Sequence, residues 1–203
     1  MKAISLISAG IDSPVSSYLM MKKCELMFLH FDGGRVKDVL EILEVLRAYS
    51  SQKRLVLIVV DHDCFIKELR KLDFPESQTC VYCKTSMLLF AERMCKEFEC
   101  EAIVTGDSLG QVASQTLLNM KAEESLLEFP VIRPLIGLDK VEIVEVARRI
   151  GTYEISTRSK ESCPYAPRHP VTRGCEVLGE VKNIVDSVEY EVLELPEPET
   201  LRI

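Results

Sequence analysis

The stretch SLISAGIDSPVSSYL, residues 5–19, decides the fold of this chain. An apolar run leads into a turn of small residues, which is followed by Asp12, Ser13 and Pro14. Ser13 is a typical N-cap residue and Pro14 a typical first helical residue, so we expect a helix to begin here. A strand, a tight turn and a helix N-terminus in succession predict an anion-binding site, because the first N–H groups of the helix face the turn.

Short apolar runs alternate with segments of helical periodicity along the rest of the chain. The apolar runs are continuous, which is typical of strands buried on both faces of a parallel sheet. A capping box of Asp139 and Glu142 predicts the start of one helix, and Gly151 its end. Pro130 predicts an edge position for the last of the apolar runs. We expect strands at Ala3–Ile7, Leu26–Phe31, Leu55–Val60, Ala102–Thr105 and Phe129–Ile132, and helices over 36–46, 84–98, 141–150 and 177–188.

This alternation predicts one doubly wound α/β domain with a parallel five-stranded sheet over residues 1–190. Residues 191–203 are rich in proline and acidic side chains, and we expect them to form a poorly ordered tail. In such a sheet the ligand binds outside the carboxyl ends of the strands, at the switch point beside the first strand. The opening stretch lies at that position.

Composition narrows the function classes. The 203 residues are 47% hydrophobic and 28% charged, as in an ordinary globular protein with a full core. The net charge of −7 argues against a large nucleic-acid-binding face on this chain alone. No apolar stretch approaches the roughly 18 residues of a membrane span, and the N-terminus does not have the pattern of a secretory signal, so we expect a cytoplasmic protein with no membrane partner.

The turn itself belongs to a known class of phosphate-binding loop. It is neither a Walker A sequence nor a dinucleotide fingerprint, since it lacks both the Gly-Lys pair and the spaced glycines. Ser-x-Gly-x-Asp-Ser, starting at Ser8, is the pattern of the PP-loop, the pyrophosphate-binding turn of ATP pyrophosphatases. Ala9 stands where most PP-loops have glycine, and its methyl group requires a negative φ. The alternative is a strand–helix turn without a ligand.

Three longer segments resemble the catalytic domain of the tRNA 4-thiouridine synthetase (ThiI) family over residues 2–175. They are SAGIDSPVSSYLMMKKCELMFLHF (8–31), VTGDSLGQVASQTLLN (104–119) and PVIRPLIGLDKVEIVEVARRIGTYEIS (130–156). The resemblance implies an enzyme that uses ATP to adenylate a tRNA uridine, at position 8, with release of pyrophosphate. Sulfur then displaces AMP and gives 4-thiouridine.

The resemblance also assigns the nucleotide contacts. Asp12 is expected beside the phosphates as a Mg²⁺ partner or orienting group. Lys84 is expected to neutralise charge in the transition state. The predicted ATP-binding residues are Leu6, Ile7, Ser8, Gly10, Asp12, Ser13, His30, Phe31, Lys84, Gly106 and Gln115.

Three cysteines are candidates for the sulfur step. Cys80 and Cys83, in TCVYCKTSM, lie one helical turn apart near a predicted helix N-terminus, so we expect both thiols to ionise easily. Cys163, in ESCPYAPRHPVTRG, matches the family loop that carries an essential cysteine. The resemblance is to the archaeal type, in which these cysteines act in place of a rhodanese domain. Three uses stay open: ligands of a [4Fe–4S] cluster, a persulfide or disulfide relay, and zinc with Cys175 or His169 as a fourth ligand or inert thiols.

The expected partners follow from the same resemblance. The first strand begins at residue 3, so we expect the tRNA-gripping THUMP region to be missing and a separate THUMP-bearing protein to supply it. Sulfide or a persulfide is the expected sulfur donor. Another PP-loop enzyme, acting on a different tRNA base, a sulfur carrier or a small molecule, is the alternative, and a nucleotide-binding regulator is a third. The oligomeric state is open, with a homodimer as one possibility.

Overall fold

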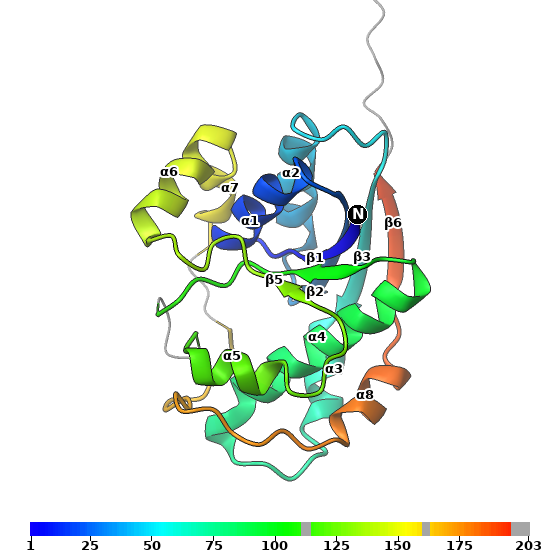
Figure 1. Ribbon diagram of the computed structural model, residues 1–203, viewed down its shortest axis with the longest axis vertical. Coiled ribbons are helices and arrows are strands. Elements are labelled where there is room, and N and C mark those ends of the chain that lie inside the picture. Colours follow the sequence, from blue (N-terminus) through cyan, green and yellow to red (C-terminus); the bar gives the residue numbers. More distant parts are fainter. Residues whose placement is uncertain (111–114, 160–162, 196–203) are drawn as a thin grey trace, which may run out of the picture.

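The computed structural model of the chain describes residues 1–110, 115–159 and 163–195 (Figure 1). Its described residues form one six-stranded sheet in the order β5-β4-β1-β2-β3-β6. The strands are β1 Lys2–Leu6, β2 Glu25–Asp32, β3 Leu55–Asp61, β4 Ala102–Val104, β5 Val131–Ile132 and β6 Glu191–Leu195. The doubly wound α/β class is confirmed.

The first five strands are parallel, and the direction of winding reverses at β1. The chain runs outward from β1 to β2 and β3, then crosses to β4 on the other side of β1 and continues to β5. Because β1 and β4 are neighbours, the loops that follow them meet at the carboxyl edge of the sheet. This is the predicted switch point.

The sixth strand corrects the sequence prediction. Strand β6 runs antiparallel to β3 and pairs Leu195 with Leu55 and Leu193 with Leu57. The tail expected from residue 191 therefore begins with an ordered edge strand, while residues 196–203 lie outside the described part. Leu193 and Leu195 alternate with an exposed glutamate, which is a period-2 signal that the proline-rich composition of the neighbouring residues obscured.

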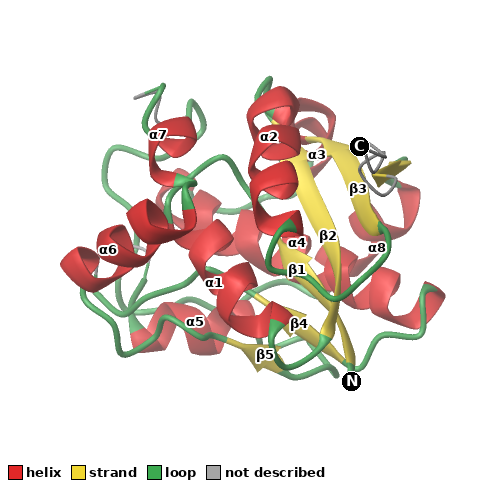
Figure 2. Cartoon of the chain, turned by 90° about the horizontal axis from the view of Figure 1, so that it is seen from above, coloured by secondary structure: helices red, strands yellow, loops and turns green. Residues whose placement is uncertain are grey.

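Helices cover both faces of the sheet (Figures 1 and 2). The capping box of Asp139 and Glu142 and the left-handed Gly151, with φ 87°, are confirmed at the ends of α6. The sequence pattern did not predict α3, α5 or α7, which are short. The helices are α1 Asp12–Met21, α2 Val36–Arg47, α3 His62–Leu69, α4 Thr79–Glu97, α5 Leu117–Glu123, α6 Lys140–Ile150, α7 Tyr153–Ser156 and α8 Val181–Ser187, with a 3₁₀ turn at Glu76–Gln78.

Two apolar cores explain why the strand sequences are continuously hydrophobic. Ile4 and Leu29 face the core under α3, α4 and α8. Ala3 and Phe28, one residue earlier on the same strands, face the core under α1, α2 and α6. Alternate residues of each central strand are thus buried on opposite faces. Among the described residues, no helix combines the length and apolar character that a bilayer crossing requires.

Docking of β6 is testable by two substitutions on the same strand. Leu195 is 6% exposed and packs in the core under α1 and α2, whereas Val192 is 44% exposed. We expect Leu195→Ala to lower the free energy of unfolding by about 2–4 kcal/mol, because it leaves a cavity in that core. Val192→Ala should change it by no more than about 0.5 kcal/mol. Urea denaturation measures both, and equal effects would contradict the pairing of β6 with β3.

Candidate nucleotide-binding site

The turn after β1 is built by two serines. Helix α1 begins at Asp12, and the N-cap position is Ile11, which makes no side-chain capping bond. The prediction that Ser13 caps the helix is therefore wrong. Its Oγ instead accepts a hydrogen bond from the backbone N–H of Ser8 at 2.8 Å and lies 3.0 Å from Ser8 Oγ, closing the turn. Pro14 falls third in the helix, still within the first turn, where its missing N–H breaks no helical bond.

Ala9 fits the turn in place of glycine. Glu99 is the one non-glycine residue with a positive φ in the described part of the chain, so Ala9 satisfies the condition that its methyl group imposes. The Ala9 side chain is buried. The next residue, Gly10, donates its N–H to Ser8 Oγ at 3.2 Å and accepts from Ser156 Oγ at 3.1 Å through its carbonyl. Helix α7 thus holds the turn from outside.

The loop after β4 packs directly on the N-terminus of α1. A Cβ atom on Gly106 would lie 2.7 Å from both the backbone N and the Cα of Ser13. Ser16 Oγ donates to the carbonyl of Thr105 at 2.7 Å and fixes the same approach. Gly106 is therefore required by close contact between two backbones, in addition to any contact with a ligand.

A cavity of about 250 Å³ lies between these two loops. Its lining includes every predicted nucleotide residue except His30. The residues that sequence reasoning placed here and the structure brings together are Leu6, Ile7, Ser8, Gly10, Asp12, Ser13, Phe31, Lys84, Gly106 and Gln115, and the cavity adds Leu29, Met87, Thr105 and Asp107.

His30 lies behind the cavity. Its ring is 4% exposed, and Nδ1 bonds to the carbonyl of Ile7 at 3.0 Å. Burial lowers the pKa of His30, so the ring is held neutral even though Asp32 lies 3.3 Å from Nε2. His30 therefore fixes the carbonyl of Ile7 just beyond the end of β1.

Lys84 reaches the cavity from α4 inside a buried group of charges. Its Nζ lies 2.5 Å from Asp107 Oδ1 and 3.4 Å from Glu123 Oε2. Burial disfavours the ammonium charge, but Asp107 and Glu123 outweigh it and raise the pKa of Lys84. Lys84 is therefore a fixed cation at neutral pH.

The two carboxylates respond differently to this cation. Burial alone would raise the pKa of Asp107, but Lys84 outweighs it and holds the pKa below its usual range. Asp107 also accepts from Thr105 Oγ1 at 2.9 Å and from Arg133 Nε at 3.3 Å. Glu123 has no exposed surface, and burial raises its pKa despite Lys84. Sequence reasoning missed both acids, although Asp107 directly follows a predicted strand and Gly106.

A second, larger cavity adjoins the first. It encloses about 640 Å³ and shares two lining residues with the nucleotide cavity, Asp12 and Gln115. Lys140, the first residue of α6, lines it and forms an ion pair with Asp12. Sequence reasoning also missed Lys140, whose signal is its place directly after the capping residue Asp139. Lys84 lines the first cavity and Lys140 the second, so each of the two cavities that meet at Asp12 has a cation.

The cysteine pair begins α4, which starts at Thr79 instead of residue 84. Cys83 Sγ lies 3.7 Å from His62 Nε2 and 3.8 Å from Met87 Sδ. Burial raises the pKa of Cys80, and burial together with the nearby Cys163 raises that of Cys83 to about 12. The expectation that both thiols ionise easily is therefore wrong, because desolvation outweighs the helix N-terminus.

Cys163 is exposed. It contributes to the raised pKa of both Cys80 and Cys83, so the loop that carries it lies near the pair. All three are free thiols. Within residues 1–110, 115–159 and 163–195, no three side chains of His, Cys, Asp or Glu are arranged as metal ligands.

Comparison with known proteins identifies the family of the chain. A family model described as "Thiamine biosynthesis protein (ThiI)" matches residues 1–190. The chain belongs to the ThiI family. A protein of Methanocaldococcus jannaschii named "Probable tRNA sulfurtransferase" is 42% identical over 193 residues, which cover 93% of this chain and 50% of that protein. One of the same name from Thermococcus kodakarensis is 45% identical over 179 residues, or 85% of this chain and 47% of that protein.

A solved ThiI-like structure matches the fold closely. The crystal structure of a 4-thiouridine synthetase–RNA complex with bound ATP superposes with a TM-score of 0.84 at 36% identity, covering 95% of this chain and 55% of that one. The chain thus spans about half the length of the curated relatives it matches. The sequence-based resemblance to the ThiI family is confirmed.

Substitution of Gly106 tests the contact between the two loops. Gly106→Ala places a methyl group against the backbone of Ser13, so we expect it to cost about 1–3 kcal/mol of unfolding free energy and to weaken ATP binding. Gly179→Ala is the matched control, because a Cβ there meets nothing within 4 Å. Urea denaturation and calorimetric titration with ATP measure the two effects. Equal behaviour of the two variants would show that the close approach is absent.

Alkylation tests the state of the cysteines. With a pKa of about 12, only roughly one Cys83 thiol in 10⁵ is ionised at pH 7. We expect iodoacetamide to modify the exposed Cys163 well before Cys83, and the Cys83 rate to rise steadily up to pH 9. Peptide mass spectrometry over a time course gives both rates, with urea-unfolded protein as the control in which Cys83 reacts freely. Equal native rates at pH 7 would contradict the raised pKa of Cys83.

Proposed function

We propose that the chain is the catalytic domain of an ATP-dependent tRNA sulfurtransferase. It adenylates a tRNA uridine, at position 8, and replaces the uridine oxygen with sulfur to give 4-thiouridine. The observation that carries the proposal is the cavity at the switch point, where the predicted nucleotide residues gather around Lys84. The names of the relatives support tRNA as the acceptor and favour no other substrate.

ATP fits the cavity with its two ends in different surroundings. Leu6, Leu29, Phe31 and Met87 form an apolar part that suits an adenine ring. The phosphates lie against the turn after β1 and the N-terminus of α1, where backbone N–H groups and the helix dipole favour negative charge. Asp12 lines both cavities and is the carboxylate suited to a Mg²⁺ ion held mainly by the phosphates.

Adenylation depends more on cations that stabilise charge on the phosphates than on general bases that remove a proton. The uridine oxygen attacks the α-phosphorus of ATP, pyrophosphate leaves, and charge builds up on the phosphate oxygens. Lys84 is held as a cation by Asp107 and Glu123, so it stabilises that charge without moving a proton. Lys140 pairs with Asp12 and lies on the side of the second cavity, from which the acceptor base approaches.

Binding of the tRNA body requires contacts beyond these 203 residues. The net charge of −7 provides little general attraction for a polyanion. A THUMP-bearing region or partner is the proposed source of those contacts.

The sulfur step is proposed to use the three cysteines as thiols. They are not arranged as a metal ligand set among the described residues, and the proposal therefore uses them as thiols. Cys163 is exposed and is the residue suited to accept sulfur from a persulfide donor. The outer sulfur of the resulting Cys163 persulfide attacks C4 of the adenylated uridine, and AMP leaves. The thiolate of Cys80 or Cys83 then attacks the Cys163 sulfur, which frees 4-thiouridine, and a thiol reductant reduces the resulting disulfide.

The adenylation half is tested by a pair of lysines on α4. Lys84→Met should lower pyrophosphate release from ATP and unmodified tRNA about 10²–10³-fold, as expected for loss of a fixed cation at the reacting phosphate. Lys96→Met is the control, since Lys96 is 54% exposed and pairs with Glu92 and Glu128 away from the cavity. Radiolabelled pyrophosphate measures the rate. Unchanged release in Lys84→Met would remove the nucleotide assignment.

The sulfur half is tested by stripping iron. Iron-free protein given ATP, tRNA, a THUMP-bearing partner and a persulfide donor should make 4-thiouridine and accumulate a Cys163 disulfide when reductant is withheld. Cys163→Ser should abolish thiolation and leave pyrophosphate release intact. Thiolation that depends on added iron and sulfide would contradict the thiol route while leaving the adenylation half standing.

A further inference from the structure

The segment after Cys163 is fastened to α3 by one aromatic side chain. Tyr165, two residues beyond Cys163, donates its hydroxyl to Asp63 Oδ1 at 2.6 Å. The guanidinium carbon of Arg70 lies 5.2 Å from the centroid of the Tyr165 ring. Asp63, near the start of α3, and Arg70, just after its end, thus both contact Tyr165.

The same helix also touches the cysteine pair. The ring of His62, the first residue of α3, packs edge-on against Tyr165 with centroids 5.7 Å apart. Its Nε2 lies 3.7 Å from Cys83 Sγ. His62 therefore contacts the Cys163 segment on one side and the start of α4 on the other.

Backbone bonds continue this docking. The carbonyl of Cys163 accepts from the N–H of Ala166 at 3.2 Å, which folds the chain back at the cysteine. Further along, Val171 donates to the carbonyl of Ser77 at 2.9 Å, just before α4. Residues 163–171 thus lie against the two elements, α3 and α4, that surround Cys83.

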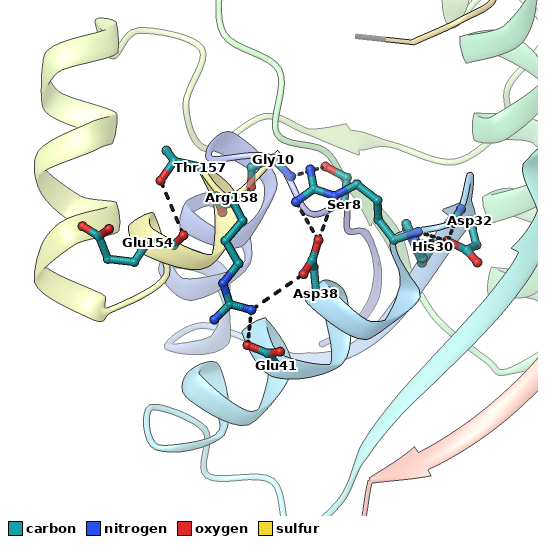
Figure 3. Close-up of polar contacts among 12 residues, drawn as sticks. Ser8, Gly10, His30, Asp32, Asp38, Glu41, Glu154, Thr157 and Arg158 are labelled. Atoms are coloured by element: carbon teal, nitrogen blue, oxygen red, sulfur yellow. Dashed lines mark hydrogen bonds and ion pairs between the residues drawn. The ribbon is translucent and has the colours of Figure 1, made fainter. Parts of the chain in front are cut away.

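The other side of the segment has a weaker anchor. Arg158 forms ion pairs with Glu41 at 2.6 Å and Asp38 at 3.8 Å on α2 (Figure 3). Arg158 and Glu41 are both about half exposed, so solvent screens the pair and its contribution to stability is small. Tyr165 is closer in sequence to Cys163; its hydrogen bond to Asp63 is exposed too, but its ring also contacts His62 and Arg70.

We propose that Tyr165 and Asp63 are positioning residues that hold Cys163 against Cys80 and Cys83. Neither residue lines the nucleotide cavity, so the pair affects the thiols without contributing to ATP binding. Held by α3, the segment that carries Cys163 stays beside the helix whose His62 contacts Cys83, which raises the effective concentration of the thiols toward one another. The role in sulfur transfer rests on the proposed function, whereas the positioning itself does not.

A redox equilibrium measures that effective concentration without ATP or tRNA. In a glutathione buffer, one glutathione disulfide oxidises Cys163 and a pair cysteine to an internal disulfide and leaves two reduced glutathione molecules. We expect this disulfide in the wild type, and Tyr165→Phe and Asp63→Asn to lower its equilibrium constant about tenfold, or about 1.4 kcal/mol. Peptide mass spectrometry of acid-quenched samples gives the disulfide fraction.

Tyr190→Phe is the matched control. The Tyr190 hydroxyl also bonds a carboxylate, that of Glu97, and Arg93 also lies over the ring, but none of these residues contacts the three cysteines. Its disulfide constant should equal that of the wild type. In the enzyme assay, Tyr165→Phe should lower tRNA thiolation while pyrophosphate release keeps its wild-type rate.

Three results would overturn the positioning role. They are no Cys163 disulfide in the wild type, an unchanged constant in both Tyr165→Phe and Asp63→Asn, or an equal fall in Tyr190→Phe. A wild-type protein that forms the disulfide but thiolates no tRNA when a THUMP-bearing partner is present would instead contradict the proposed function and leave the positioning intact.

Discussion

The contact between the loop after β4 and the first turn of α1 is the constraint on which the site depends. Two backbones meet there so closely that a single methyl group on Gly106 would lie 2.7 Å from Ser13. Both loops follow strands that are neighbours only because the winding reverses at β1. The sheet order therefore brings the two loops together around the cavity. Gly106 allows their close approach because it has no side chain, and the hydrogen bonds between Ser8 and Ser13 fix the conformation of the PP-loop.

Charge is distributed around this cavity in a way that a net charge of −7 does not suggest. Lys84 is fixed by two buried acids on one side, and Lys140 is paired with Asp12 on the other. The surrounding acids keep these lysines protonated and oriented, so incoming phosphates meet preorganised cations. An acidic protein thus presents local positive charge at this cavity.

The sequence predicted the parts of the site that follow from local rules. The strand-turn-helix pattern around Ser8 and Asp12 located the switch point, and the capping box located α6. It could not predict contacts made by residues distant in sequence. The ion pair of Lys140 with Asp12 joins residues 128 positions apart, and the burial that silences Cys83 comes from neighbours on several elements. Nor could the sequence predict that the His30 side chain is buried and does not line the cavity, since a strand end has two faces and only the fold decides which one a side chain takes.

The state of the thiols shows how burial and access are divided between residues. A buried thiol is protected from oxidation but is a poor nucleophile, because its thiolate is rare. Cys83 is only partly buried by its accessible surface, but desolvation raises the pKa of its thiol, whereas Cys163 is exposed and lies on a segment that α3 holds in place. In the proposed sulfur step, the exposed Cys163 receives sulfur and a thiol of the Cys80–Cys83 pair resolves it. Exposure and desolvation are thus found on different cysteines, and the contacts of Tyr165 and His62 connect the segments that carry them.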